Sequence, residues 1–268
     1  MITVLGSGGF IGSSLVKKLK AKGIPYNAPA KGEEAAQNLG HVVYCIGLTA
    51  DFRRKPFETV EAHVCLLNKI LEKAKFESLT YLSSTRVYIS SKEKEVFENT
   101  PITISIDDPD ELYTLTKLTG ERLCLSSGHN AKVVRLSNVY GDDYSSENFI
   151  IDIIKRIKTE KFIRFFTTPA SAKDYISIDP LCDLLISIAV KGKEKIYNVA
   201  SGENVSNADI IGILKEHYKF GYDFDDNARE IVFPLINIDR IKNEFGFISK
   251  TNKKNISELI KKHGNDNN

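Results

Sequence analysis

A cluster of glycines near the N-terminus constrains the fold of this chain more than any other feature. It lies between an apolar run, Ile2–Leu5, and a helical pattern, Gly12–Lys22. Glycines spaced by three at such a turn allow a sharp bend, close approach to a pyrophosphate and tight helix–strand packing, while the helix N-terminus offers free N–H groups to the anion. We therefore expect a dinucleotide-binding turn, with a glycine-rich turn without a ligand as the alternative. The residues expected at the cofactor are Gly6, Gly9, Phe10, Ile11 and Gly12.

Short apolar runs alternate with amphipathic helices through the first half of the chain, a pattern typical of parallel βαβ units. The expected elements are strands at Ile24–Ala28, His41–Ile46, Leu79–Leu82 and Lys132–Leu136, with helices at Phe57–Ala74 and Glu111–Ser126. After Gly141 the pattern is looser. The expected elements there are Phe149–Ile157, Phe162–Phe166, Tyr175–Ile178, Asp179–Val190, Ile196–Val199, Asn207–His217 and Ile238–Phe245.

These elements predict an α/β fold, a Rossmann-like doubly wound parallel sheet with a smaller C-terminal α/β substrate lobe. We assign residues 1–140 to the dinucleotide-binding domain, with a strand and a helix returning from about 174–200. Residues 141–268 are assigned mainly to the substrate-binding lobe. The tail from Gly264 is polar, and we expect it to fray.

Charge and composition narrow the function classes. The 268 residues include 37 basic and 35 acidic side chains, and the net charge of +2 gives no basic footprint for nucleic acid. The apolar stretches are too short to cross a membrane. The first strand begins at the N-terminus, so we expect no signal peptide and a cytoplasmic protein. The four cysteines form no CxxC pair, so we expect reduced thiols and no metal site.

Tyr113 and Lys117 lie four residues apart in the helix Glu111–Ser126, which places both side chains on one helix face. A nearby ammonium stabilises a phenolate and lowers its pKa from about 10, as would an oxidised nicotinamide. Tyr113 could then exchange a proton with a substrate hydroxyl or carbonyl. Ser84 follows the strand Leu79–Leu82 at the ligand-binding edge of such a sheet, where its hydroxyl could orient the reacting oxygen. Ser83 and Thr85 compete with Ser84 for this role. A surface helix and a plain strand-ending turn are the alternatives without a catalytic function.

The residues after the second strand bear on the choice between NAD and NADP. An NAD site usually has a carboxylate there for the ribose 2′-OH, but the place near Ala30 has none and Lys31 follows it. A cation without a competing carboxylate suits a 2′-phosphate, so the sequence favours NADP over NAD, with Lys31 as a cofactor contact. An exposed lysine in a turn is the alternative, and a ribose contact by Glu33 or Glu34 would reverse the preference.

Six motifs follow one another along the chain. They are Gly6-x-x-Gly9-Phe10-Ile11-Gly12, Leu82-Ser83-Ser84-Thr85-Arg86-Val87-Tyr88, Tyr113-x-x-x-Lys117, Arg135-Leu136-Ser137-Asn138-Val139-Tyr140-Gly141, Lys173-Asp174-Tyr175-Ile176-Ser177-Ile178-Asp179 and Tyr197-Asn198-Val199-Ala200-Ser201-Gly202-Glu203. With these motifs nearly the whole chain resembles the extended short-chain dehydrogenase/reductase family, the NAD-dependent epimerase/dehydratase group that acts on nucleotide-linked sugars.

The resemblance implies a role for each matching residue. Tyr113 matches the acid/base, Lys117 its partner at the nicotinamide ribose, and Ser84 the catalytic hydroxyl. The expected substrate-binding residues are Thr85, Arg86, Asn138, Asn148 and Lys173, with Asn138 at the substrate diphosphate. Arg164 is a further candidate anion contact, with an ordinary ion pair as its alternative. Asn198 is expected to support a turn.

Departures from the family pattern reduce the number of reactions that the chain could catalyse. The dehydratases carry Asp-Glu after the catalytic hydroxyl, where this chain has Thr85-Arg86. Water elimination would lack its acid and base, so dehydratase activity is disfavoured. His63 replaces an asparagine that is usual in its helix. The missing ribose carboxylate weakens the case for an epimerase with tightly held NAD.

We therefore expect reduction of a 4-keto nucleotide sugar by exchangeable NADPH. The alternatives are a 4-epimerase with internal hydride return, an enzyme of a small secondary metabolite or cofactor precursor, and a non-catalytic NADP-sensing or scaffold protein. The helices Phe57–Ala74 and Glu111–Ser126 are expected to pair with their copies in a homodimer, as in the family. The apolar stripe of the first helix also suits the core.

Overall fold

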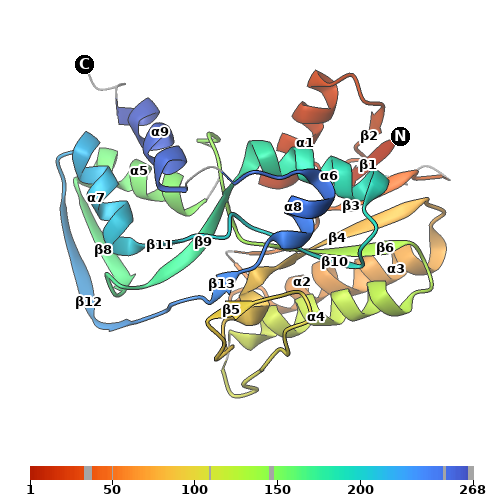
Figure 1. The fold of residues 1–268 in the computed structure, drawn as a ribbon, viewed down its shortest axis with the longest axis horizontal. Coiled ribbons are helices and arrows are strands. Elements are labelled where there is room, and N and C mark those ends of the chain that lie inside the picture. The colour runs from red at the N-terminus through yellow and green to blue at the C-terminus, as the bar shows by residue number, and fades with distance from the viewer. Residues whose placement is uncertain (33–37, 50, 109, 145–147, 250–251, 265–268) are drawn as a thin grey trace.

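The centre of the structure, a computed structural model, is a parallel sheet (Figure 1). The structure describes residues 1–32, 38–49, 51–108, 110–144, 148–249 and 252–264. In the described chain the sheet has the strand order β10-β6-β4-β3-β1-β2. Its strands are β1 (Ile2–Leu5), β2 (Tyr26–Asn27), β3 (His41–Tyr44), β4 (Ser78–Ser84), β6 (Ala131–Leu136) and β10 (Ile196–Val199). The sheet and the returning strand Ile196–Val199 are thus as the sequence predicts.

Helices cover both faces of this sheet, which explains the nearly continuous apolar sequence of its central strands. One face carries α1 (Phe10–Ala21) and α6 (Ile178–Lys191), and the other carries α3 (Leu66–Lys73) and α4 (Glu111–Ser126). Adjacent residues of a strand point to opposite faces. Val133 and Val134 accordingly enter two different hydrophobic cores.

Two elements near the nucleotide end differ from the prediction. The second strand is only Tyr26–Asn27 instead of Ile24–Ala28, because Pro25 and Pro29 flank it and proline donates no ladder hydrogen bond. The expected single helix Phe57–Ala74 is interrupted. It consists of α2 (Pro56–Val60), a π-helical turn at Glu61–Cys65, and α3.

A second hydrophobic core, rich in isoleucine, lies beside the main sheet. It is enclosed by strands that pair as β11-β9-β7 and β12-β8, and by three helices (Figure 1). These elements are β7 (Asn138–Tyr140), β8 (Phe162–Thr167), β9 (Ala172–Ser177), β11 (Asn204–Ser206), β12 (Gly221–Arg229), α5 (Phe149–Glu160), α7 (Asn207–His217) and α9 (Asn252–Gly264). The sequence analysis predicted neither β12 nor α9. It expected fraying from Gly264, which is the last residue of α9. The residues after Gly264 lie outside the described ranges.

The remaining elements connect the two regions. They are the 3₁₀ turn Thr85–Tyr88, the paired strands β5 (Glu95–Val96) and β13 (Leu235–Ile236), and α8 (Asp239–Phe245). In the described part of the chain, no helix is both long enough and apolar enough to cross a membrane.

The order of the sheet creates a binding crevice. The chain passes from β1 to β2 on one side and then to β3 on the other side of β1. At such a switch point the loops after the two strands diverge, and open α/β sheets bind ligands there. Gly6 follows β1 with φ of +86°, and a Cβ there would lie 2.9 Å from the carbonyl carbon of Cys45, just after β3. The glycine turn therefore forms one wall of the crevice.

Candidate active site

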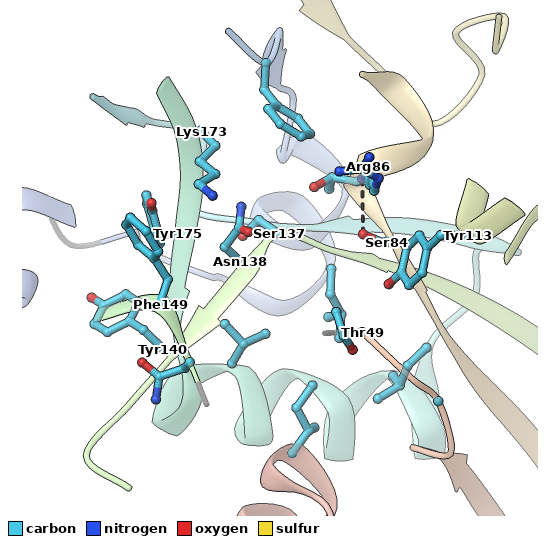
Figure 2. A pocket seen from close by; sticks show the side chains of 18 of the residues that line it. Thr49, Ser84, Arg86, Tyr113, Ser137, Asn138, Tyr140, Phe149, Lys173 and Tyr175 are labelled. Carbon is cyan, nitrogen blue, oxygen red and sulfur yellow. Dashed lines mark hydrogen bonds between the residues drawn. The ribbon is translucent and has the colours of Figure 1, made fainter. Parts of the chain in front are cut away.

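A cavity of about 650 Å³ extends from the glycine turn to the second core. This is within the usual size of small-molecule sites. Figure 2 shows Ser84, Thr49 and Tyr113 at one side of a pocket. Lys173 and Asn138 lie at the other side. The cavity is thus bounded by both regions of the fold.

The glycine turn has the geometry of an anion cradle. Gly9 is the N-cap of α1 and has no side chain to occupy the first N–H groups of the helix, and Gly9, Phe10 and Ile11 line the cavity. Gly6 and Gly12 instead support the turn, because a Cβ on Gly12 would lie 2.2 Å from the carbonyl oxygen of Gly6. The residues present therefore fit a dinucleotide pyrophosphate.

Tyr113, Lys117 and Ser84 come together at the cavity, as the sequence predicts. Tyr113 and Lys117 are both 5% exposed on one face of α4, and Lys117 Nζ lies 5.8 Å from the centre of the Tyr113 ring. The ammonium donates a hydrogen bond of 2.8 Å to the carbonyl oxygen of Leu82 in β4. Ser84 ends β4, and its Oγ accepts a 3.1 Å hydrogen bond from the Arg86 amide.

The electrostatics differ from the expectation in one respect. Burial raises the pKa of Tyr113, and this effect outweighs the hydrogen bonds with Ser84 and Thr49 and the charge of Arg86, which lower it. The sequence predicted a lowered phenol pKa from Lys117. Burial instead lowers the pKa of Lys117 itself to about 7. The desolvation of both groups therefore dominates their mutual attraction.

The loop between β3 and α2 contributes cavity residues that the sequence analysis missed. Thr49 places a second hydroxyl, in addition to that of Ser84, beside the phenol of Tyr113 (Figure 2). The Phe52 ring lies 5.2 Å from the Tyr113 ring and 4.5 Å from the Arg53 guanidinium. Thr49 follows a parallel strand at the same sheet edge as Ser84, so the argument made for Ser84 could have found it.

The far side of the cavity is cationic and aromatic. Lys173 Nζ lies 4.8 Å from the centre of the Phe149 ring, and burial together with the charge of Arg86 lowers the lysine pKa. Asn138 donates a 2.9 Å hydrogen bond to the Asp174 carbonyl oxygen. Asn148 caps α5 by accepting a hydrogen bond from a backbone amide. Both asparagines line the cavity.

Among the described residues, the charged side chains that line the cavity are all basic. Arg53, Arg86, Lys117 and Lys173 line it, and none of the lining residues in the described ranges is acidic. Asp110 lies behind this wall and pairs with both Arg53 and Arg86, the latter at 3.1 Å. A site with this excess of cations favours anionic ligands.

Other candidates lie elsewhere. Arg164 does not line the cavity and pairs with Asp223 and Asp225, so its role as an ordinary ion-pair partner holds. Asn198 is buried, where it accepts a hydrogen bond from the Tyr88 hydroxyl. Lys31 is exposed and outside the cavity lining.

Two further expectations concern the cofactor preference and metals. Glu33 and Glu34 fall outside the described residues, so the cofactor preference stays a prediction. Within the described ranges no group of His, Cys, Asp or Glu side chains is arranged to hold a metal ion.

Thr85 is buried and lines the cavity beside Ser84.

Comparison with known sequences identifies one family. The model of the NAD dependent epimerase/dehydratase family matches residues 2–200. Among curated proteins, the dTDP-glucose 4,6-dehydratase of Streptomyces griseus is 24% identical over 144 residues. That match covers 52% of this chain and 42% of the relative, so it spans less than half the length of the dehydratase.

Solved structures share the fold over almost their full length. MoeE5 in complex with UDP-glucose and NAD has a TM-score of 0.79 at 19% identity, with 97% of each chain covered. RMD from Pseudomonas aeruginosa, complexed with NADPH, has a TM-score of 0.75 at 19% identity, with 99% of each chain covered.

Proposed function

The chain belongs to the NAD-dependent epimerase/dehydratase family, and on this premise we propose that it is an NAD(P)-dependent oxidoreductase that reduces the 4-keto group of a nucleotide-linked sugar. One observation carries the proposal. Tyr113, Ser84 and Lys117 converge on a cavity that also contains the glycine turn and no described acidic side chain.

The catalytic residues supply the proton of the reduction. Ser84 and Thr49 hold the substrate oxygen and the phenol together, and Tyr113 donates its proton to that oxygen. A reduced nicotinamide, when bound, would supply the hydride for the keto carbon, which with the proton from Tyr113 accounts for the alcohol. Lys117 would contact the nicotinamide ribose and would stabilise the phenolate that remains.

The fold provides a place for both ligands. The Gly9–Ile11 turn would bind the cofactor pyrophosphate at the start of α1. Lys173, Arg86 and Asn138 would face the diphosphate of the substrate, and the Phe149 ring offers an apolar surface beside Lys173. MoeE5, a structural neighbour, binds UDP-glucose and NAD, which supports a ligand pair of this kind.

The acid/base inventory favours reduction over elimination. Elimination of water needs a general acid and a general base near the sugar, and Thr85 and Arg86 stand where the dehydratases carry carboxylates. A 4-epimerase with internal hydride return would use the same residues and is the second candidate. The retained Tyr113 and Lys117 argue against a sensor or scaffold protein. An enzyme of a small metabolite would not need the cationic far side.

We propose NADP as the exchangeable cofactor, since Lys31 follows the second strand where no carboxylate stands. The neighbour from Pseudomonas aeruginosa binds NADPH whereas MoeE5 binds NAD, so the fold accommodates either dinucleotide.

The test offers the protein a panel of uridine, thymidine and guanosine diphosphate 4-keto-6-deoxyhexoses with NADPH or NADH, and follows absorbance at 340 nm. We expect oxidation of NADPH, with lower kcat/KM for NADH. Interconversion of UDP-glucose and UDP-galactose without added cofactor would establish the epimerase instead. No turnover of any sugar would reject both.

The residue-level test is Tyr113→Phe. The variant keeps the ring that packs on Phe52, so we expect NADPH affinity near the wild-type value and kcat lowered by about 10²–10⁴-fold. Activity within severalfold of wild type would show that the phenol is not the acid/base.

A further inference from the structure

His63 is fully buried behind the cavity, in the π-helical turn Glu61–Cys65. Both of its ring nitrogens have partners. Nε2 lies 3.2 Å from the Leu48 amide, which donates to it, and Nδ1 lies 2.9 Å from Thr116 Oγ1. The ring also meets the Tyr113 ring edge-on, with 5.4 Å between the ring centres. His63 thus bridges the β3–α2 loop and the helix of the acid/base.

These contacts fix the direction of each hydrogen bond. Nε2 accepts a backbone N–H, so it carries no proton. In the neutral ring the proton is then on Nδ1, which donates to Thr116 Oγ1, and the Thr116 hydroxyl in turn donates a 3.0 Å bond to the Tyr113 carbonyl oxygen. Burial and the charge of Lys117 lower the pKa of His63 to about 3, so the ring is neutral near neutral pH.

The two ends of this chain of bonds meet the catalytic groups. Leu48 immediately precedes Thr49, whose hydroxyl lies at the phenol of Tyr113. Gly47 precedes Leu48 in the same loop, and a Cβ on Gly47 would lie 3.2 Å from His63 Nε2 and 3.3 Å from Lys117 Nζ. The loop, the imidazole and the ammonium are therefore packed closely around one glycine, and a side chain there would displace the imidazole or the ammonium.

We propose that His63 is a positioning residue that fixes the Gly47–Thr49 loop, and with it the Thr49 hydroxyl, against Tyr113 and Lys117. The inference rests on the proposed function, because it assigns the acid/base to Tyr113. An asparagine at this position would end near the place of Nδ1 and could replace only the bond to Thr116. The longer imidazole adds the bond to the loop.

Two substitutions separate the two bonds, because glutamine places its terminal amide near Nε2 and asparagine near Nδ1. We expect His63→Asn to lower kcat by about tenfold at nearly unchanged substrate KM, the effect of one lost hydrogen bond in the transition state. We expect His63→Gln to recover most of that loss. The reverse order, or wild-type kcat in His63→Asn, would overturn the proposal.

A double-mutant cycle tests the route through Thr49. Thr49→Val removes the hydroxyl itself, and we expect a fall in kcat similar to that of His63→Asn. If His63 acts through Thr49, the double variant falls no further than the larger single effect. Losses that multiply would contradict this route. Thermal unfolding of each variant separates a folding defect from a loss of kcat.

The imidazole itself is observable without any substrate. We expect ¹⁵N NMR of the five histidines to contain one ring, absent from His63→Asn, in the Nδ1–H form that does not titrate between pH 5 and 8. An Nε2–H form, or titration near pH 6.5, would overturn the proposal even in an active enzyme. If that signal is as expected and no sugar is reduced, only the proposed function fails.

Discussion

Lys117 shows how a single residue at the cavity affects both stability and function. Burial lowers its pKa from the ordinary lysine value of 10.5 to about 7. Below pH 7 both the folded and the unfolded chain hold the proton, and between pH 7 and 10.5 only the unfolded chain holds it. Stability of the wild type therefore rises with pH across this window.

We expect Lys117→Met to be more stable than wild type at pH 7, by about 3–6 °C in Tm, and the difference to disappear near pH 10.5. Calorimetry at several pH values measures it, and the exposed Lys20→Met serves as the control without this trend. Equal Tm values at pH 7 would mean that burial of the ammonium carries no penalty. Catalysis should be lost in the same variant.

The sequence predicted that Tyr113, Lys117 and Ser84 lie together, from the helical spacing of the first two and the strand end at Ser84, and all three line the cavity. Their catalytic roles stay a prediction. The sequence did not reveal Phe52, because the contact of its ring with the phenol depends on the path of a loop. Thr49 was missed although it follows β3 at the same sheet edge as Ser84. The prediction that the pKa of Tyr113 is lowered was wrong, because a spacing of four residues does not show how deeply the two side chains are buried.

At the scale of elements, the glycine turn depends on the close packing of α1 against its preceding loop. A methyl group on Gly12 would overlap the Gly6 carbonyl oxygen, whereas a Cβ on Gly8 meets no atom within 4 Å. We expect Gly12→Ala to lose about 1–3 kcal/mol of unfolding free energy and to bind NADPH more weakly. Gly8→Ala should stay within about 0.5 kcal/mol. Denaturant titration compares them, and equal stabilities would contradict the packing argument.

Elements with a regular apolar period were predicted well: α4, α7 and β10 have the expected bounds. Of the missed elements, β12 lacks such a period. β12 carries Asp225 and Asp226 within a strand of mixed exposure, and α9 presents Ile256 and Ile260 among lysines. The structure of β12 depends on its pairing with β8, which is distant in sequence, so no local pattern predicts it. The spacing of Ile256, Leu259 and Ile260 in α9 is a helical apolar period that the sequence analysis overlooked.

At the scale of the whole molecule, α9 completes the second core. Ile260 is fully buried, while the next residue, Lys261, is exposed. We expect Ile260→Ala to cost about 2–5 kcal/mol and Lys261→Ala less than about 0.5 kcal/mol. Calorimetry of both variants checks this, and equal transitions would show that α9 contributes little to the fold.

The homodimer remains a prediction. The helices α2, α3 and α4 lie on one outer face of the sheet, and Phe57 at the start of α2 is 86% exposed there (Figure 1). We expect light scattering to give a dimer and Phe57→Lys to shift it toward monomer. A wild-type monomer at micromolar concentration would remove the proposal.

The cavity cations lie on separate parts of the chain, Arg86 after a strand of the main sheet and Lys173 on a strand beside the second core. Arg86 lowers the pKa of Lys173, which means that the two charges repel one another. A dianion placed between them would turn this repulsion into attraction on both sides. Relief of the repulsion between these two cations would then contribute to the affinity for the dianion.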